Sequence, residues 1–242
     1  MKLKLVTCAM ISREMQAAVS RCANEVEVVL LPAALHREGA AALRDAVQQA
    51  IDAAGGACDA VLIGYGLCGN GLSGLRAGAV PLVVPRAHDC IALLMGSRHR
   101  YREYFDSHPG VYFLSTGWME EGAALEPSAL TQLSGYELDD LVRKYGDDNG
   151  RYLYETLHQY EHNYRQFTFI ENGFDQDAAS ACGAEQLAAR RGWGFEKIAG
   201  DLRLFHNLVD GVWDPADFLV VPPGKQVVAS YDDGILGVED AA

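Results

Sequence analysis

Ala60-Val-Leu-Ile-Gly-Tyr-Gly-Leu-Cys-Gly-Asn-Gly71 is the stretch around which the rest of this 242-residue sequence is organised. It begins as an apolar run of strand character and then breaks into four glycines around one cysteine, Cys68. A strand that runs into glycine brings its backbone to a place where a Cβ would obstruct, so that another group can come close. The stretch therefore predicts a buried strand over 60–64 that ends at a functional site.

Strand-like and helical patterns alternate on both sides of this stretch. Short apolar runs predict strands at 2–8, 26–31, 60–64, 80–84, 111–116, 167–170, 195–198 and 217–221. Periodic apolar positions predict helices at 10–23, 40–54, 89–105, 139–164, 178–191 and 201–209. Nearly continuous apolar strands that alternate with helices are typical of a parallel sheet covered by helices on both faces. We predict an α/β fold of Rossmann-like architecture with a mainly parallel sheet.

The predicted elements divide the chain into two parts. A first α/β half at 1–116 carries the cysteine site, a connection follows at 117–138, a second α/β half spans 139–230, and 231–242 is an acidic tail. The segment Leu82-Val-Val-Pro85 is echoed by Leu219-Val-Val-Pro222, which indicates two related α/β halves. The acidic tail consists of small and charged residues, so we expect it to be loose.

Composition and charge exclude several classes of protein. The formal net charge of −13 argues against nucleic acid and anionic membranes as partners, because both favour basic surfaces. No apolar run reaches the ~18–20 residues of a membrane span, and the N-terminus lacks a signal-peptide pattern. Six cysteines are too few for a disulfide scaffold in a chain of this length. We expect a cytoplasmic protein that acts on a small molecule.

Three of the cysteines come directly after predicted strands: Cys8, Cys68 and Cys90. Because ligands of open parallel sheets bind outside the carboxyl ends of the strands, these sulfurs are expected to converge at one place. Three thiolates repel one another unless a soft cation stabilises them, and three protein ligands with one open position are typical of catalytic zinc. The pattern predicts a metal site with zinc, or alternatively a [4Fe–4S] cluster. Buried structural cysteines remain the alternative, since the chain has no tight C-x-x-C pair.

Polar residues before Cys90 extend the predicted site. His88 is expected to act as an acid–base, with a fourth-ligand role or a supporting role beside a thiolate as alternatives. Arg86 is expected to hold an anion, with a surface ion pair as its alternative. Asp89 is suited to cap the helix that follows, with no further role required.

Glycines and an asparagine beside Cys68 are the expected ligand-contacting residues. Gly66 and Gly69 clear space beside the thiol, and Asn70 is suited to a tight turn or to a hydrogen bond with a ligand. The segment is not a nucleotide-binding fingerprint, because it lacks the G-x-G-x-x-G register.

Three segments carry a family resemblance: Gly64-Tyr-Gly-Leu-Cys-Gly-Asn70, Pro85-Arg-Ala-His-Asp-Cys90 and Leu94-Met-Gly-Ser97. Through them the chain resembles the domain of unknown function 1638 family of bacteria and archaea. The resemblance covers most of the chain and implies an association with corrinoid-dependent methyltransferases, hence with one-carbon transfer. The sequence itself contains no corrinoid motif such as D-x-H-x-x-G.

Two functions follow from these observations. The first is a metal-dependent enzyme, a transferase or lyase, that binds and activates a small thiol, carboxylate or methyl donor at the open metal position. The second is a non-enzymatic accessory protein that delivers metal to a corrinoid-dependent methyltransferase. We favour the enzyme, because glycines beside Cys68 leave room for a ligand that a delivery site does not require.

Overall fold

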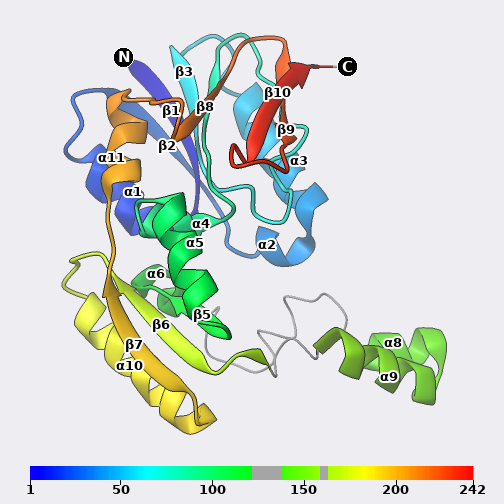
Figure 1. Ribbon diagram of the computed structural model, residues 1–242. Coiled ribbons are helices and arrows are strands. Elements are labelled where there is room, and N and C mark those ends of the chain that lie inside the picture. Colours follow the sequence, from blue (N-terminus) through cyan, green and yellow to red (C-terminus); the bar gives the residue numbers. More distant parts are fainter. Residues whose placement is uncertain (122–137, 159–162, 242) are drawn as a thin grey trace. The chain divides into compact units, whose positions relative to one another are not determined.

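The chain folds into two compact units. A computed structural model describes residues 1–121, 138–158 and 163–241 (Figure 1). Unit 1 comprises Met1–Arg102 and Gly200–Ala242, and unit 2 comprises Glu103–Ala199. Most of the predicted connection at 117–138 lies outside the described residues.

A five-stranded sheet forms the centre of unit 1, in the order β2-β1-β3-β4-β8. Its strands are β1 (Lys2–Cys8), β2 (Glu25–Leu31), β3 (Ala60–Gly64), β4 (Leu82–Pro85) and β8 (Phe218–Val221). The first four are parallel, and β8 is antiparallel to β4. The predicted α/β fold with a mostly parallel sheet is therefore confirmed.

Helices cover both faces of this sheet. Figure 1 shows α1 (Ser12–Val19) and α11 (Arg203–Asp210) on one side and α3 (Ala40–Asp52) on the other. The apolar face of α3 consists of Leu43, Val47 and Ile51, all fully or almost fully buried, as their spacing predicts. Two short helices, η1 (Ala9–Ile11) and α2 (Leu35–Glu38), follow β1 and β2.

The order in which successive strands are added to the sheet reverses at β1. The chain leads from β1 to β2 on one side and then passes back to β3 on the other side of β1. Such a reversal is a topological switch point, and the carboxyl ends of the two strands beside it form the usual ligand crevice of open α/β sheets. Cys8 and the glycine-rich stretch after β3 lie at this switch point.

The single helix predicted at 89–105 is two helices, α4 (Cys90–Leu94) and α5 (Arg98–Ser107). The break falls at Gly96, whose φ of 68° is in the left-handed region. A Cβ at Gly96 would stand 2.6 Å from Asp201 Cβ, so tertiary packing as well as backbone conformation requires glycine there.

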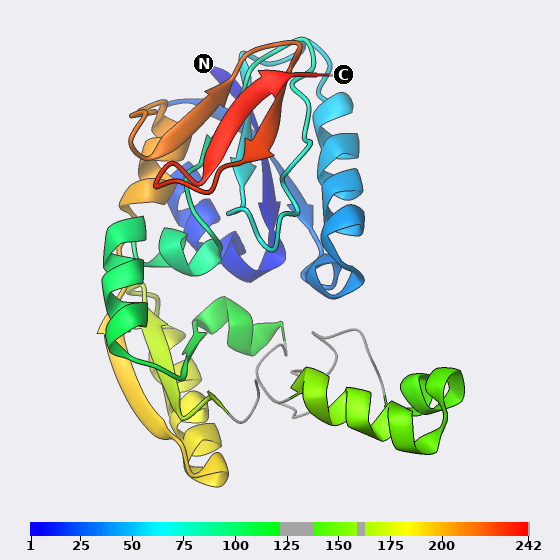
Figure 2. The same cartoon turned by 45° about the vertical axis from the view of Figure 1, so that its right-hand side comes forward.

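The C-terminal region differs from its prediction. The described part of the predicted tail, residues 231–241, is not loose, because β10 (Leu236–Asp240) pairs antiparallel with β9 (Lys225–Ala229) in a hairpin (Figure 2). Burial of Ile235 and Leu236 holds the hairpin in place. The second copy of the echoed segment, which we assigned to the second half, is β8, and it pairs with the first copy in β4, Leu82 opposite Val221.

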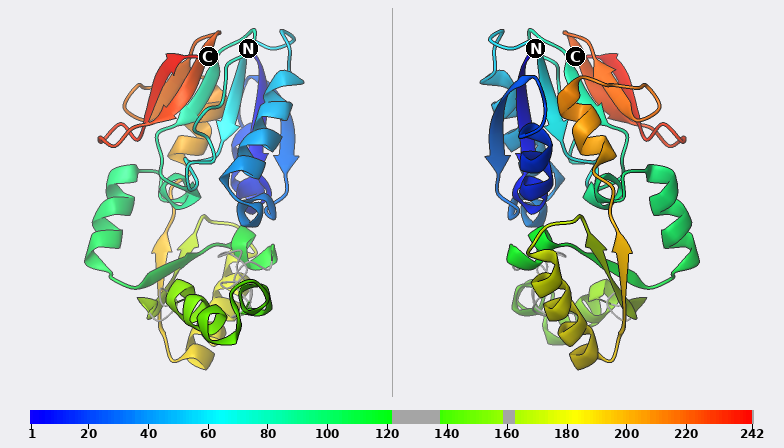
Figure 3. Two further views of the ribbon diagram at one scale, coloured as in Figure 1. Left: turned by 90° about the vertical axis from the view of Figure 1, so that its right-hand side faces the viewer. Right: turned by 90° about the vertical axis from the view of Figure 1, so that its left-hand side faces the viewer.

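Unit 2 has its own parallel sheet, in the order β5-β6-β7 (Figure 3). The strands are β5 (Val111–Leu114), β6 (Gln166–Glu171) and β7 (Gly194–Ala199), and its helices are α6 (Thr116–Glu120), α8 (Leu138–Tyr145), α9 (Asp147–His158) and α10 (Asp177–Arg191). Buried Phe167, Phe169 and Leu187 form part of the core between the sheet and α10. No helix in the described ranges is long and apolar enough to cross a membrane.

Candidate functional site

The three cysteines lie where three neighbouring strands end. Cys8 is the last residue of β1, Cys68 lies four positions beyond β3, and Cys90 is the first residue of α4 after β4. Because β3 pairs with both β1 and β4, all three cysteines lie at the carboxyl edge of one continuous parallel sheet. Cys8 and Cys90 are buried, and Cys68 is partly exposed.

Backbone hydrogen bonds join the loop after β3 to the loop after β4. Leu67 N donates to Ala87 O at 2.8 Å, and Cys68 N donates to His88 O at 2.8 Å. A Cβ at Gly66 would stand 2.6 Å from Asp89 Cα, so the loops approach this closely only with glycine at that position. The structure thus gives Gly66 a packing role, and that role brings Cys68 next to the start of α4.

Cys8, Cys68 and Cys90 each influence the side chain of Tyr65. Burial raises the pKa of the Tyr65 phenol, and the neighbouring groups of Cys8, Cys68 and Cys90 raise it further. Tyr65 is almost completely buried, at 1% exposure, directly after β3. Tyr65, which the sequence reasoning did not select, therefore lies near all three cysteines at this edge of the sheet.

His36 is the second residue that the sequence reasoning missed. Its Nε2 atom lies 3.4 Å from Cys8 Sγ, and its ring centroid lies 6.0 Å from that of Tyr65. Burial lowers the pKa of His36, so the imidazole is neutral near pH 7. His36 lies in α2, shortly after β2 ends at the same sheet edge, and this position was the signal that could have revealed it.

Cys68 occupies an unusual backbone conformation. Its φ of 46° is left-handed, and Gly69 and Asn70 continue the turn with φ values of 63° and 68°. A left-handed conformation costs a residue with a Cβ on the order of 1 kcal/mol or more, and such strain is concentrated at functional sites. Gly69 borders open space and Asn70 is exposed, so both remain candidates for contact with a ligand.

The Cys68 thiol is held in its protonated form. Burial raises its pKa, as do the nearby charges of Asp89 and Cys8, while hydrogen bonds from the backbone N–H groups of Gly66 and Cys90 lower it. The effects that raise the pKa of Cys68 outweigh those that lower it. A stable thiolate at this position therefore needs an additional positive charge nearby.

Asp89 caps the N-terminus of α4, which is the role that the sequence predicts for it. Its Oδ1 accepts hydrogen bonds from Ile91 N and Ala92 N at 3.0 and 3.3 Å, and its Oδ2 accepts one from the Tyr101 hydroxyl at 3.0 Å. Burial raises the pKa of Asp89 in spite of these bonds. His88 immediately precedes it on the loop, with an exposed side chain.

Arg86 lies apart from the three cysteines. Its guanidinium donates hydrogen bonds to Pro215 O, Gly234 O and Leu236 O, which places it on the β8 side of β4. The Cys68 loop is bonded to the opposite, β3, side of β4. Arg86 and the cysteines therefore belong to two different sites of unit 1.

Within the described ranges, the thiols and carboxylates of this site are not arranged as a preformed metal site. Among the described residues, no three His, Cys, Asp or Glu side chains stand at the mutual distances of ligands of one ion. Cys8 and His36 form a pair of donors at the site, with Sγ and Nε2 3.4 Å apart.

Comparison with known proteins places the chain in a family. Searches of curated proteins and of solved structures gave no match. Residues 30–209 match the family described as "Protein of unknown function (DUF1638)", a span that includes His36, Cys68 and Cys90 and begins after Cys8. The match covers more than half of the sequence and agrees with the resemblance of its glycine–cysteine and His-Asp-Cys segments. The chain is thus a member of the DUF1638 family.

Proposed function

We propose that the chain is a metal-dependent enzyme in which Cys8, Cys68 and Cys90 bind a soft metal at the carboxyl edge of the unit 1 sheet. The observation that carries the proposal is the position of all three cysteines at the carboxyl ends of the neighbouring strands β1, β3 and β4, beside a topological switch point. The architecture is Rossmann-like, and the two units, each with a parallel sheet, represent two related α/β halves. Zinc is the first choice of metal, and a [4Fe–4S] cluster is the alternative.

The chemistry of the donors fits a soft cation. Thiols are the ligands that zinc and iron–sulfur clusters prefer, and two of the three here, Cys8 and Cys90, are buried. The raised pKa of Cys68 shows that a thiolate there needs a positive charge nearby. Metal binding would require rotation of the side chains, since the described donors do not yet stand at the distances of one coordination shell.

The residues around the thiols have separate tasks in this proposal. A bound metal would supply a Lewis acid with an open position for a small thiol, carboxylate or methyl donor. His36 orients Cys8 through the 3.4 Å contact, and neutral imidazole donates its N–H to a thiolate. Tyr65 closes one wall of the site with a phenol that stays protonated. His88, exposed on the adjacent loop, exchanges protons with the ligand.

The reaction class follows from the family resemblance alone, which implies methyl or one-carbon transfer in a corrinoid-dependent system. The buried state of Cys8 and Cys90 favours an enzyme over an accessory protein that hands its metal to a partner. A delivery site must expose its ligands for exchange, whereas an enzyme keeps them enclosed.

Metal analysis of cysteine variants tests the proposal. A Cys8→Ser/Cys68→Ser/Cys90→Ser variant should contain no metal after anaerobic purification, whereas the wild type should contain one zinc ion per chain. A Cys22→Ser/Cys58→Ser/Cys182→Ser variant is the matched control, because these three cysteines lie outside the site, and it should retain the metal. A brown wild-type protein that contains iron would identify the cofactor as the [4Fe–4S] cluster and not zinc. Stoichiometric metal in the first variant, or a wild type without zinc and iron, would overturn the proposal.

A further inference from the structure

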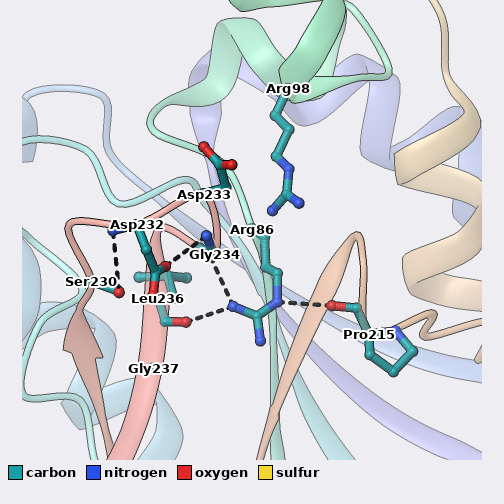
Figure 4. A pocket seen from close by; sticks show the side chains of 9 residues that line it. All are labelled: Arg86, Arg98, Pro215, Ser230, Asp232, Asp233, Gly234, Leu236 and Gly237. Atoms are coloured by element: carbon teal, nitrogen blue, oxygen red, sulfur yellow. Dashed lines mark hydrogen bonds between the residues drawn. The ribbon is translucent and has the colours of Figure 1, made fainter.

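A second site lies in unit 1 between the end of β4 and the C-terminal hairpin. The pocket has a volume of about 490 Å³, with walls from Pro215 and from residues of the hairpin between Ser230 and Gly237. Figure 4 shows the side chains of Arg86 and Arg98 at this pocket. A pocket of this size is in the range that accommodates small organic molecules.

Arg86 is fixed in position by backbone carbonyls. Its Nε donates to Pro215 O at 2.9 Å, and its Nη1 donates to Gly234 O at 2.8 Å and to Leu236 O at 2.5 Å. These bonds use one edge of the guanidinium and leave the N–H groups of Nη2 for a ligand. In the described part of the chain, no carboxylate lies within 4 Å of this guanidinium.

Arg98, the first residue of α5, supplies a second guanidinium. Its Nη1 atom is buried and has no hydrogen-bond partner among the described residues. Burial lowers the pKa of Arg86, and the positive charge of Arg98 lowers it further, which shows that the two guanidiniums act on each other. Two like charges that face one cavity are unfavourable unless an anion lies between them.

The two acidic residues that line the pocket, Asp232 and Asp233, interact with groups other than the two guanidiniums. Asp232 Oδ1 accepts a hydrogen bond from Gly234 N at 2.7 Å, and Asp233 Oδ1 lies 3.4 Å from Nη1 of Arg102. Asp232 still offsets part of the charge of Arg86 through space. Neither carboxylate forms an ion pair with Arg86 or Arg98.

We infer that this pocket binds the oxyanion group of a small organic molecule, a phosphate or a carboxylate, between Arg86 and Arg98. Guanidinium groups bind such anions through paired N–H donors, and a preorganised group loses little conformational freedom on binding. The inference extends the anion-binding role expected for Arg86, assigns Arg98 as its partner and does not depend on the proposed metal.

Binding of inorganic phosphate and of succinate to the full-length protein, measured by calorimetry at constant ionic strength, tests this inference. The wild type should bind one of the two at millimolar concentration, and the one that binds identifies the group. Arg98→Gln should weaken that binding by at least about tenfold. Arg76→Gln is the control of equal charge, because Arg76 is an exposed residue outside the pocket. Arg86 is not substituted, since its hydrogen bonds hold the hairpin.

Two results would overturn the inference: a wild type that binds neither anion, or an Arg98→Gln variant that binds as tightly as the wild type. Circular dichroism of the variant establishes that it is folded. Its metal content should equal that of the wild type, so failure of this inference is distinguishable from failure of the proposed metal site.

Discussion

Cys8 Sγ lies 3.4 Å from His36 Nε2, although the two residues are 28 positions apart and belong to different elements. The contact forms because β1 and β2 are parallel neighbours, so α2, which follows β2, begins at the same sheet edge where β1 ends. A half-buried, neutral imidazole beside a thiol is an arrangement that supports a thiolate, either on a metal or alone. This relationship gives the candidate site a residue whose role can be measured separately from the cysteines.

Substitution of His36 should weaken the metal site without abolishing it. We expect His36→Ala to reduce zinc affinity roughly ten- to a hundredfold, because the hydrogen bond that orients Cys8 is lost. Competition with a chromogenic chelator measures the change. His99→Ala, at an exposed position of α5, is the control and should bind zinc like the wild type. Equal affinity of the His36→Ala variant and the wild type would mean that the Cys8–His36 contact does not support the metal.

Substitution of His88 should leave the metal in place. His88 is exposed on the loop before Asp89, so we expect His88→Ala to retain one zinc ion per chain and to lose ligand turnover. Elemental analysis of the variant beside the wild type measures the first effect. Loss of zinc from this variant would instead show that His88 is a fourth ligand and that the site is closed, as in structural zinc sites.

The left-handed conformation of Cys68 predicts that two small substitutions differ in their effect on stability. Glycine adopts a φ of 46° without a steric cost, whereas alanine keeps the Cβ that makes this conformation unfavourable. We expect metal-free Cys68→Gly to be more stable than metal-free Cys68→Ala by about 1 kcal/mol. Urea unfolding of both variants with chelator present measures the difference. If the alanine variant is the more stable, the loop does not hold Cys68 in this conformation.

The sequence predicts the central sheet well because its inner strands β1, β3 and β4 are almost completely buried and read as continuous apolar runs. Every residue of β3 is buried, and the run Ala60–Gly64 was predicted with the bounds that the structure shows. The position of Cys8, Cys68 and Cys90 at one sheet edge follows from the same property, since parallel strands end at one edge.

Features that depend on distant contacts were not predictable in this way. The break at Gly96 reflects close packing against Asp201, more than a hundred positions away. The C-terminal hairpin is held by hydrogen bonds from Arg86 and by burial of Leu236, neither of which a local pattern reveals. His36 was missed because only the pairing of β1 with β2 brings it to Cys8.

Unit 2 allows a prediction about pH. The Tyr104 hydroxyl donates to Glu196 Oε2 at 2.9 Å and lies 2.8 Å from Thr168 Oγ1. Burial raises the pKa of Tyr104, and the Glu196 carboxylate raises it further. A phenol whose pKa is higher in the folded than in the unfolded state contributes stability that is fully present below about pH 10 and is lost as the pH rises through the folded-state pKa.

The melting temperatures of the wild type and of Tyr104→Phe should therefore converge at alkaline pH. We expect the wild type to melt at a higher temperature than the variant near neutral pH, and the difference to shrink above about pH 10. Differential scanning calorimetry over this range measures it. A difference that stays constant from neutral to alkaline pH would show that the Tyr104 proton is not linked to folding.

The metal site is tested most directly by X-ray absorption spectroscopy at the zinc edge of the anaerobically purified protein. The proposed site predicts three sulfur ligands at about 2.3 Å and one nitrogen or oxygen ligand at about 2.0 Å. The sulfur contribution should disappear in the Cys8→Ser/Cys68→Ser/Cys90→Ser variant. A zinc spectrum without sulfur ligands in the wild type, or a sulfur shell that persists in the triple variant, would contradict the assignment of Cys8, Cys68 and Cys90 as its ligands.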